Sequence, residues 1–210
     1  MVSMQGIIEL RRAQATVWQQ TDMNTTFCAG DMIRARSQSR AALRLSNDSM
    51  LRLDQRTSLT FPELQAEKST SLLDLLEGAI HIITRTPKPF KIRTPFVNAS
   101  VEGTEFFVGV HEDNAEVVVY EGKVSVSNDL GSLVLNDHEA AITFKDQAPR
   151  KEILIRPTDA VQWALYYPAI IDYWQDDEVK KEQYANTLIR EAGRLLTVGQ
   201  ADEAKRNIQQ

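Results

Sequence analysis

The most regular pattern of apolar and polar positions in the chain lies in residues 94–128. Apolar residues alternate with other residues in three consecutive short runs, which predicts three β-strands because strand side chains point alternately to opposite faces. Segments 112–114 and 121–122 separate the runs with residue types that favour tight turns. This stretch is predicted to be a structural or binding core, since it holds no nucleophile–base pair and no metal-ligand spacing. The alternating residues are Phe106, Val108 and Val110, then Val117 and Val119, then Val124 and Val126.

The same alternation extends from Gly6 to about Ile155 and predicts further short strands. The composition of residues 71–77 suits a helical turn, and alternation returns at residues 78–82. The other predicted strands are residues 7–10, 15–18, 32–33, 41–45, 50–53 and 59–61, and segments around Leu133, Leu135, Ala140, Ile142 and Phe144, with a last strand at residues 153–155.

A loose internal echo relates three parts of this region. Residues 76–80 resemble residues 120–124, and residues 29–33 are a weaker copy, with a glycine at the same place in each. Such an echo favours β-structure built in several similar layers, each too thin to bury its apolar face alone. We therefore predict a mainly β fold, either a many-stranded β-solenoid or a flattened antiparallel β-sandwich. In the sandwich, Asn47–Asp48 and Asn114 would head hairpins.

The character of the sequence changes at Arg156–Pro157. We predict a β domain over residues 1–155, an aromatic-rich junction over 156–175 and a helical segment over 176–210, which forms a C-terminal helical hairpin. Acids at the start of the last segment, and an apolar face at helical spacing, support the helix. The junction holds five aromatic residues that either pack the two parts together or bind a sugar or a protein partner. They are Trp163, Tyr166, Tyr167, Tyr173 and Trp174.

Composition narrows the function classes. Hydrophobic residues make up 42% and charged residues 25% of the 210 residues, as in soluble globular proteins. The net charge of -5, without a clustered basic stripe, argues against nucleic acid as a partner. No apolar run is long enough to span a membrane, and no signal peptide opens the chain. The single cysteine, Cys28, excludes an intramolecular disulfide and is predicted to be a small buried hydrophobic residue.

Candidate catalytic residues do not form a recognisable motif. Four acids could pair as general acid and base, but each is placed where aspartate suits a turn. They are Asp22, Asp31, Asp48 and Asp54. Of the histidines, His81 is predicted on a solvent face, and the spacing of His111 and His138 does not indicate convergence. Residues 136–139 could offer oxygen ligands to a hard metal, but a plain turn is the preferred interpretation. We predict neither an enzyme nor a cofactor.

Taken in order along the chain, these residues resemble the FecR-like domain of bacterial envelope proteins. The matching positions are Gly30, Asp31 and Ile33; Ala42, Leu43, Arg44 and Leu45; Leu51, Arg52, Leu53, Thr57 and Leu59; Thr94 and Pro95; Val101, Gly103, Thr104, Phe106 and Val108; Val117, Val119, Glu121, Gly122, Val124 and Val126; and Gly131 and Leu135. Two positions depart from the family pattern. Glu102 replaces a basic residue, and His138 replaces a glycine, so a differently built turn is expected there.

The tail from Leu188 resembles the beginning of a tetratricopeptide repeat. The packing positions are Leu188, Ala192, Leu195, Gly199, Ala201, Ala204 and Ile208. One such unit cannot bury its own face, so we expect the natural protein to continue past Gln210 as a helical repeat array.

The two resemblances imply a non-catalytic protein of the bacterial envelope or periplasm, a scaffold or signalling module that binds an outer-membrane or other envelope protein. Exposed β-edges are the expected binding surface, and the sequence leaves the oligomeric state open. The alternative is a carbohydrate- or peptidoglycan-binding module that uses the aromatic residues between Trp163 and Trp174.

Overall fold

The computed structural model describes residues 1–62, 71–84, 90–101 and 103–152. The chain divides into two compact units, Met1–Pro168 and Ala169–Gln210, and every described residue belongs to the first. The predicted strand at 153–155, the junction at 156–175 and the helical segment at 176–210 lie outside the described residues. Within the described ranges, no helix is long and apolar enough to cross a bilayer.

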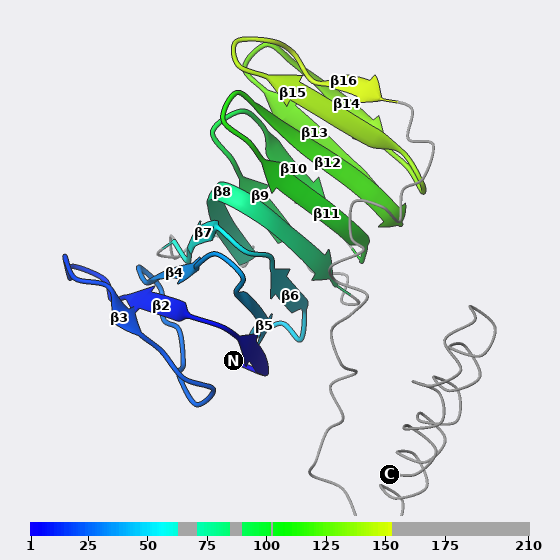
Figure 1. Ribbon diagram of the computed structural model, residues 1–210. Helices are drawn as coiled ribbons and strands as arrows, with labels where there is room; N and C mark the ends of the chain where they lie inside the picture. The colour runs from blue at the N-terminus through cyan, green and yellow to red at the C-terminus, as the bar shows by residue number, and fades with distance from the viewer. Residues whose placement is uncertain (63–70, 85–89, 102, 153–210) are drawn as a thin grey trace, which may run out of the picture. The chain divides into compact units, whose positions relative to one another are not determined.

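The described residues form sixteen strands, which confirms the predicted mainly β class (Figure 1). The strands are β1 Ser3–Gln5, β2 Ile8–Arg11, β3 Gln19–Gln20, β4 Met32–Ala35, β5 Arg40–Arg44, β6 Met50–Leu53, β7 Thr57–Thr60, β8 Ser71–Ile83, β9 Phe90–Arg93, β10 Asn98–Val101, β11 Glu105–Val110, β12 Asn114–Glu121, β13 Val124–Asn128, β14 Gly131–Leu135, β15 Ala140–Phe144 and β16 Arg150–Glu152.

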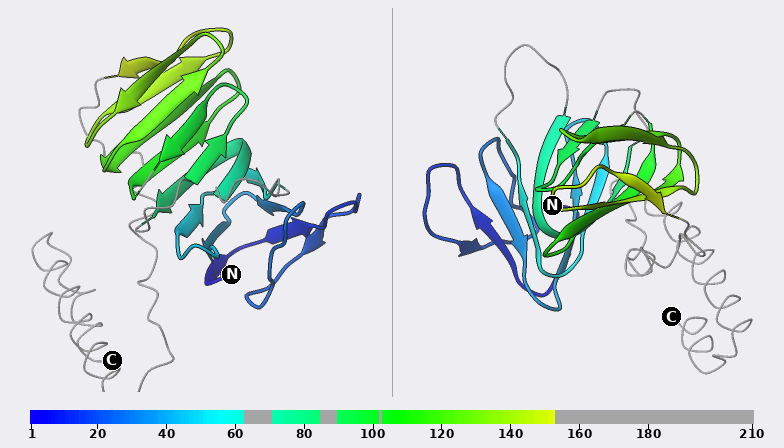
Figure 2. Two further views of the ribbon diagram at one scale, coloured as in Figure 1. Left: turned by 180° about the vertical axis from the view of Figure 1, so that it is seen from behind. Right: turned by 90° about the horizontal axis from the view of Figure 1, so that it is seen from above.

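The strands form two layers around one hydrophobic core (Figure 2). We call sheet A the layer of β1, β5, β6, β11, β12, β15 and β16, and sheet B the layer of β2, β3, β4, β7, β9, β10, β13 and β14. Along each strand, alternate residues enter the core, as Ile8 and Leu10 do in β2. This alternation is the pattern from which the strands were predicted.

Strand β8 belongs to both sheets. Its first part pairs with β7 and β9 in sheet B, and its second part pairs with β6 and β11 in sheet A. The predicted helical turn at residues 71–77 is therefore wrong. Leucine-rich sequence suits a helix, but Leu73 and Leu75 are both buried at strand spacing between neighbouring strands. Tertiary packing overrides local propensity here.

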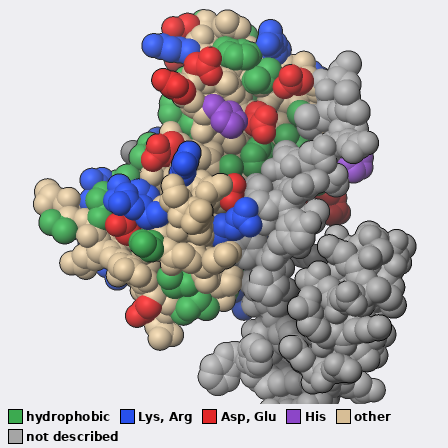
Figure 3. Space-filling view, viewed as in Figure 1, with side chains coloured by type: hydrophobic (Ala, Val, Ile, Leu, Met, Phe, Trp, Pro, Cys, Tyr) green, Lys and Arg blue, Asp and Glu red, His purple; other side chains and the backbone are tan. Residues whose placement is uncertain are grey.

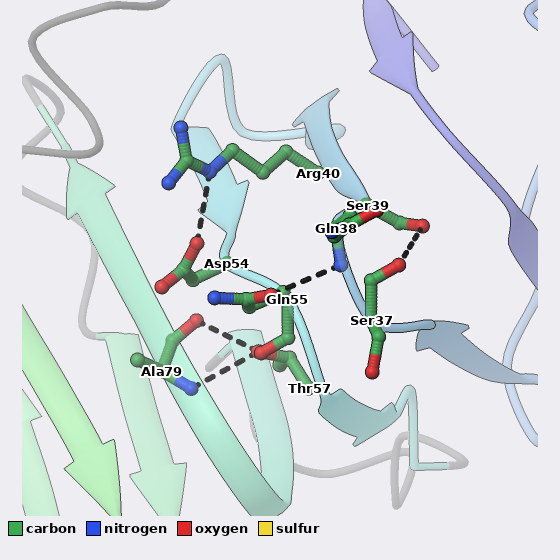
Figure 4. A network of polar contacts seen from close by, with 8 residues as sticks. All are labelled: Ser37, Gln38, Ser39, Arg40, Asp54, Gln55, Thr57 and Ala79. Atoms are coloured by element: carbon green, nitrogen blue, oxygen red, sulfur yellow. Dashed lines mark hydrogen bonds and ion pairs between the residues drawn. The ribbon is translucent and has the colours of Figure 1, made fainter.

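The chain passes from sheet B to sheet A at Gly78. All earlier crossings between the two sheets lie at the same end of the sandwich as Gly78. We call it the Gly78 end. The chain crosses there at Gly6, between β4 and β5, and between β6 and β7. Figure 4 shows polar contacts among the crossing from β4 to β5, the crossing from β6 to β7 and the crossing at Gly78. The Thr57 hydroxyl donates to the Ala79 carbonyl over 3.1 Å, and Arg40 donates to Asp54 over 2.9 Å.

After β8 the crossings move to the opposite end of the sandwich, which we call the Ile83 end. Glu105, the first residue of β11, is the cross-strand partner of Ile83 in β8 and of Glu121 in β12. Gly103 lies just before Glu105 and Gly122 just after Glu121, so the two crossings are neighbours. The crossing from β14 to β15 joins them, because the Gly122 amide donates to Asp137 Oδ1 over 2.6 Å. Hairpin turns occupy the other end of this half.

Each described crossing contains a residue with left-handed backbone. Gly78 and Gly122 have φ values of 86° and 94°, and in each a side-chain Cβ would lie 2.5 Å from the threonine beneath, Thr57 or Thr104. Only glycine fits such a contact without displacing its neighbour. At residues 136–139, where the family resemblance expects a glycine, His138 adopts a φ of 63°, within the region that glycine favours.

Pairing between strands favours the sandwich over the solenoid. Among the described strands, β8 and β9 are the only parallel pair, whereas successive coils of a solenoid would lie parallel. The hairpins expected at Asn47–Asp48 and Asn114 are present between β5 and β6 and between β11 and β12. The three strands predicted in residues 94–128 are confirmed as β11, β12 and β13. The strand predicted at residues 15–18 is wrong, because β3 begins at Gln19.

Candidate functional site

The four carboxylates proposed as acid and base serve separate structural contacts. Asp31 pairs with Arg12, Asp48 with Arg44 and Asp54 with Arg40, at N–O distances of 2.7, 3.0 and 2.9 Å. Asp22 lies in an exposed turn, where its carboxylate accepts from the amide of Asn24. A pair of catalytic carboxylates needs a shared cleft, and these four contacts do not provide one.

Asp31 holds together the long loop between β2 and β4. Its carboxylate is buried and accepts hydrogen bonds from the Cys28 amide at 2.9 Å, the Ala13 amide at 3.0 Å and Arg12 at 2.7 Å. Burial raises the pKa of Asp31, but these hydrogen bonds together outweigh burial and hold the pKa below its usual value. The role of Asp31 is therefore to fix this loop.

His81 lies in β8, and the prediction that its side chain faces solvent is wrong. It points away from the main core, as the alternation predicted, yet its exposed fraction is only 2%. Its Nε2 atom lies 3.0 Å from Glu105 Oε1, and its ring meets Tyr120 edge-on with centroids 5.8 Å apart. His111 and His138 lie exposed in turns. The described residues contain no group of three or more side chains placed to hold a metal ion.

The outer face of sheet A around His81 is a second, smaller apolar cluster. Phe107, Val118 and Ala140 are buried there and lie on three neighbouring strands. Two ionisable groups belong to the same face. Burial, followed by the Glu116 and Glu105 charges, raises the pKa of Tyr120, and burial with the Glu152 charge raises the pKa of Glu116 against the opposing effect of His111. Both groups are thus held in their neutral forms more strongly than in water.

The open end of the N-terminal half contains a groove with both apolar and polar lining. All described crossings of this half lie at the Gly78 end, so no described crossing joins the two sheets at the Ile83 end of β5 and β7. A groove of about 570 Å³ opens there. Cys28 lines it and is exposed, so the prediction of a buried cysteine is wrong. Its apolar lining comes from Phe27, Leu43, Leu45, Phe61, Leu72 and Phe90.

The C-terminal half has its groove at the opposite end, again away from its crossings. This groove of about 590 Å³ lies among four hairpin turns and is polar. Asn128 joins two of these turns, because its Nδ2 atom donates to the carbonyls of Phe96 at 3.3 Å and Gln147 at 2.7 Å. The charged lining residues are Glu112, Asp129, Lys145 and Asp146.

An arginine-rich surface with one tryptophan lies on the outer face of sheet B near the N-terminus. This surface lies on β2 and β4, and Figure 3 shows basic side chains gathered over these two strands. The guanidinium carbons of Arg11 and Arg34 lie 5.2 and 4.3 Å from the ring centroid of Trp18. Glu9 accepts from Arg34 at 2.7 Å and lies 3.4 Å from Arg36. The sequence pattern does not indicate this surface, because its members come from three separate segments, residues 9–11, residue 18 and residues 34–36.

Strand β14 is the last strand of sheet B among those described. It pairs with β13 alone, and its outer face carries Val134, which is 45% exposed. Leu130, just before the strand, is 60% exposed. The five aromatic residues predicted as a binding cluster, Trp163, Tyr166, Tyr167, Tyr173 and Trp174, lie outside the described residues, as does Glu102.

Comparison with known proteins gives one family match and a structural likeness. A family model described as FecR protein matches residues 31–125, from the buried Asp31 to the start of β13. Two crystal structures of a proposed anti-sigma factor from Parabacteroides distasonis ATCC 8503 are similar to this chain, each with 20% identity and a TM-score of 0.57. The match covers 63% of this chain and 64% or 63% of the other, and it shows a shared fold. No curated protein matches the chain.

Proposed function

We propose that this chain is a non-catalytic signalling module of the bacterial envelope that binds a protein partner along the edge of sheet B. The observation that carries the proposal is strand β14. Among the described strands only β13 pairs with β14, so its other side offers main-chain groups to an added strand, and the exposed Val134 and Leu130 suit a partner side chain.

The geometry of β14 fits a short added strand. Gly131, its first residue, packs close to Ala148, so the accessible part begins at Ser132. From there to Leu135 the exposed residues are Ser132 and Val134, on the face directed away from the core. Main-chain hydrogen bonds would supply affinity in such a complex, and the contact with Val134 would supply selectivity.

The signalling role and the envelope location rest on similarity. The match of residues 31–125 to the FecR protein family and the likeness to a proposed anti-sigma factor both favour regulation through protein contacts over catalysis. The described residues agree with that class, because their buried carboxylate and histidine serve internal contacts. The partner expected for such a module is another envelope protein.

The test uses two lysine variants on one face. Val134 and Ser125 are direct cross-strand neighbours on β14 and β13. We expect immobilised wild-type protein to retain a protein from envelope extract, Val134→Lys to lose it, and the matched control Ser125→Lys to keep it. Equal retention by Val134→Lys would exclude strand addition at β14. Failure of the wild-type protein to retain any envelope protein would exclude the function itself.

The carbohydrate-binding alternative depends on aromatic residues outside the described part of the chain and stays a prediction. Co-sedimentation with purified peptidoglycan, using Trp163→Ala and Trp174→Ala variants, separates it from the protein-binding proposal. Residues 176–210, interpreted as the start of a tetratricopeptide repeat, remain a predicted second docking segment that the same capture experiment tests by truncation after Ile155.

A further inference from the structure

We propose that the arginine–tryptophan face of sheet B, formed by Glu9, Arg11, Trp18, Arg34 and Arg36, binds an acidic segment of a protein. The face lies on β2 and β4, apart from strand β14, so the proposal does not depend on strand addition there.

The registers of the strands place these side chains on one surface. Glu9 faces Arg34 and Arg11 faces Met32 across β2 and β4, and directly paired residues point to the same side of a sheet. Trp18 immediately precedes β3, whose Gln19 pairs with Leu10, so the indole reaches Arg11. Arg36 follows β4 and reaches Glu9. The result is one contiguous face of three guanidinium groups and one indole.

The charges of the face do not balance. Glu9 is the one carboxylate paired with these arginines among the described residues, and it serves Arg34 and Arg36. No acidic partner of Arg11 occurs in the described ranges, and one of its Nη atoms donates to the sulfur of Met32. The face therefore has an excess of positive charge on a chain whose net charge is -5. A carboxylate ligand is the complement of such a face.

Two of the three guanidinium groups of the face are already restrained before a ligand binds. Stacking on Trp18 fixes Arg11 and Arg34, and Glu9 fixes Arg34 further through the 2.8 Å hydrogen bond from its Nε atom. A guanidinium over an aromatic ring keeps N–H groups at its rim for a carboxylate. Arg34 already uses Nε and Nη2 on Glu9, so its Nη1 and the remaining N–H groups of Arg11 are left for the ligand. Less side-chain freedom then remains to be lost on binding.

Exposed apolar residues next to the face favour a protein as its ligand. Val17 is 65% exposed and Ile7 is 48% exposed, and they adjoin Trp18 and β2 respectively. Tryptophan and arginine beside exposed apolar residues match the composition of protein-binding hot spots. We therefore assign the face to a segment in which glutamate or aspartate alternates with apolar residues. An anionic membrane and a second copy of this chain are the competing occupants.

The test is fluorescence anisotropy with a labelled peptide of alternating glutamate and leucine, at an ionic strength of about 0.15 M. We expect Arg11→Gln and Arg36→Gln each to weaken binding by about threefold to tenfold. Glu9→Gln removes the competing carboxylate and should strengthen binding. This gain separates a binding role from structural damage, because a damaged face would bind more weakly.

Three binding controls and a check of folding complete the experiment. Arg44→Gln changes an exposed, paired arginine on sheet A and should leave binding unchanged, as should Val134→Lys on β14. A peptide with lysine in place of glutamate should not bind. Circular dichroism checks that each variant is folded.

The proposal is overturned by any of four results: no binding by the wild-type protein, equal binding of the lysine peptide, equal loss in Arg44→Gln, or weaker binding by Glu9→Gln. Arginine-dependent sedimentation with phosphatidylserine vesicles, without peptide binding, would assign the face to a membrane. Self-association that Arg11→Gln abolishes, measured by light scattering, would assign it to a second copy. Loss of the envelope partner in Val134→Lys with peptide binding intact separates this face from β14.

Discussion

The strands before Gly78 and the strands after it cross between the two sheets at opposite ends of the sandwich. Before Gly78 the crossings are joined by side chains, including Arg40 to Asp54 and Thr57 to Ala79. Main-chain groups join the crossings of both halves as well, as in the bonds from the Asp54 amide to the Ala79 carbonyl at 3.0 Å and from the His138 amide to the Val119 carbonyl at 2.9 Å. The two halves are therefore closed by the same kinds of contact, but at opposite ends.

This difference places an open groove at opposite ends of the two halves. The N-terminal groove contains Cys28 and several large apolar side chains, whereas the C-terminal groove lies among charged turns. The charges differ as well, because residues 1–62 contain arginine but no lysine, and residues 103–152 contain more acids than bases. Two halves with one architecture thus present surfaces suited to different partners.

The largest expected effect is at Gly78, the crossing shared by the halves. In Gly78→Ala the new Cβ would lie 2.5 Å from the Thr57 Cα and 2.6 Å from the Arg56 carbonyl, both backbone atoms that cannot move aside. Together with the strain of a φ of 86°, this should lower the free energy of unfolding by more than about 4 kcal/mol. Urea unfolding followed by circular dichroism measures it.

The matched control for this substitution is Gly103→Ala. Gly103 has a φ of 62°, but an added Cβ would meet no atom within 4 Å. Only the backbone cost of about 1 kcal/mol should then appear. Equal losses at both positions would show that the backbone conformation, and not the contact with Thr57, makes Gly78 necessary.

Gly122→Ala tests the equivalent crossing in the C-terminal half. Its nearest obstacle is the Thr104 methyl group at 2.5 Å, with the Gly103 carbonyl at 3.1 Å. A methyl group can rotate or shift where a backbone atom cannot, so we expect a smaller loss of about 3 kcal/mol. Combining it with Thr104→Ser, which removes that methyl group, should restore part of the loss, whereas no restoration would contradict the steric explanation.

Asp31→Asn tests a contact found only in the N-terminal half. It removes a charged acceptor from two amides and Arg12, and we expect a loss of about 2 kcal/mol at neutral pH. Because the folded pKa of Asp31 is lowered, its stabilisation is present above the unfolded pKa and disappears as the pH falls through the folded pKa. Wild type and variant should therefore converge in stability at acid pH. Parallel curves would contradict the linkage.

The smallest effect, and one of opposite sign, is expected for Glu116→Gln on the outer face of sheet A. Burial raises the folded pKa of Glu116, so its ionised form destabilises the fold above that pKa, and stability is regained as the pH falls through it. The variant should be more stable than wild type by less than about 1 kcal/mol at neutral pH, and the gain should shrink in acid. Thermal unfolding over a pH series measures both slopes.

The sequence predicted the parts of the fold that depend on alternation and on glycine. The strands of residues 94–128 follow from their valines, and the left-handed backbone of Gly103 and Gly122 follows from the residue type. The other crossings could not be predicted in this way, because Gln38, Arg56 and His138 adopt positive φ without a sequence signal. Their conformation is imposed by the sheets that they connect.

The binding surfaces were largely beyond prediction. His81 occupies the outward position that alternation assigns to it, but alternation cannot tell a covered outer face from an exposed one. The arginine–tryptophan face requires the pairing of β2 with both β3 and β4, which depends on long-range register. Edge strands were anticipated as a class, but only the strand order identifies β14 as one of them.

Strand β8 also determines how the chain can fold during its synthesis. Strands β6 and β7 each find their second neighbour in β8, so until residues 71–83 leave the ribosome both present unpaired backbone groups. The first sixty residues therefore emerge as two incomplete sheets, and their unpaired edge strands are prone to aggregate. When β8 forms, it pairs with β6 in one sheet and with β7 in the other, so neither remains an edge strand. β8 then becomes the new edge of both sheets, to which β9 and β11 add.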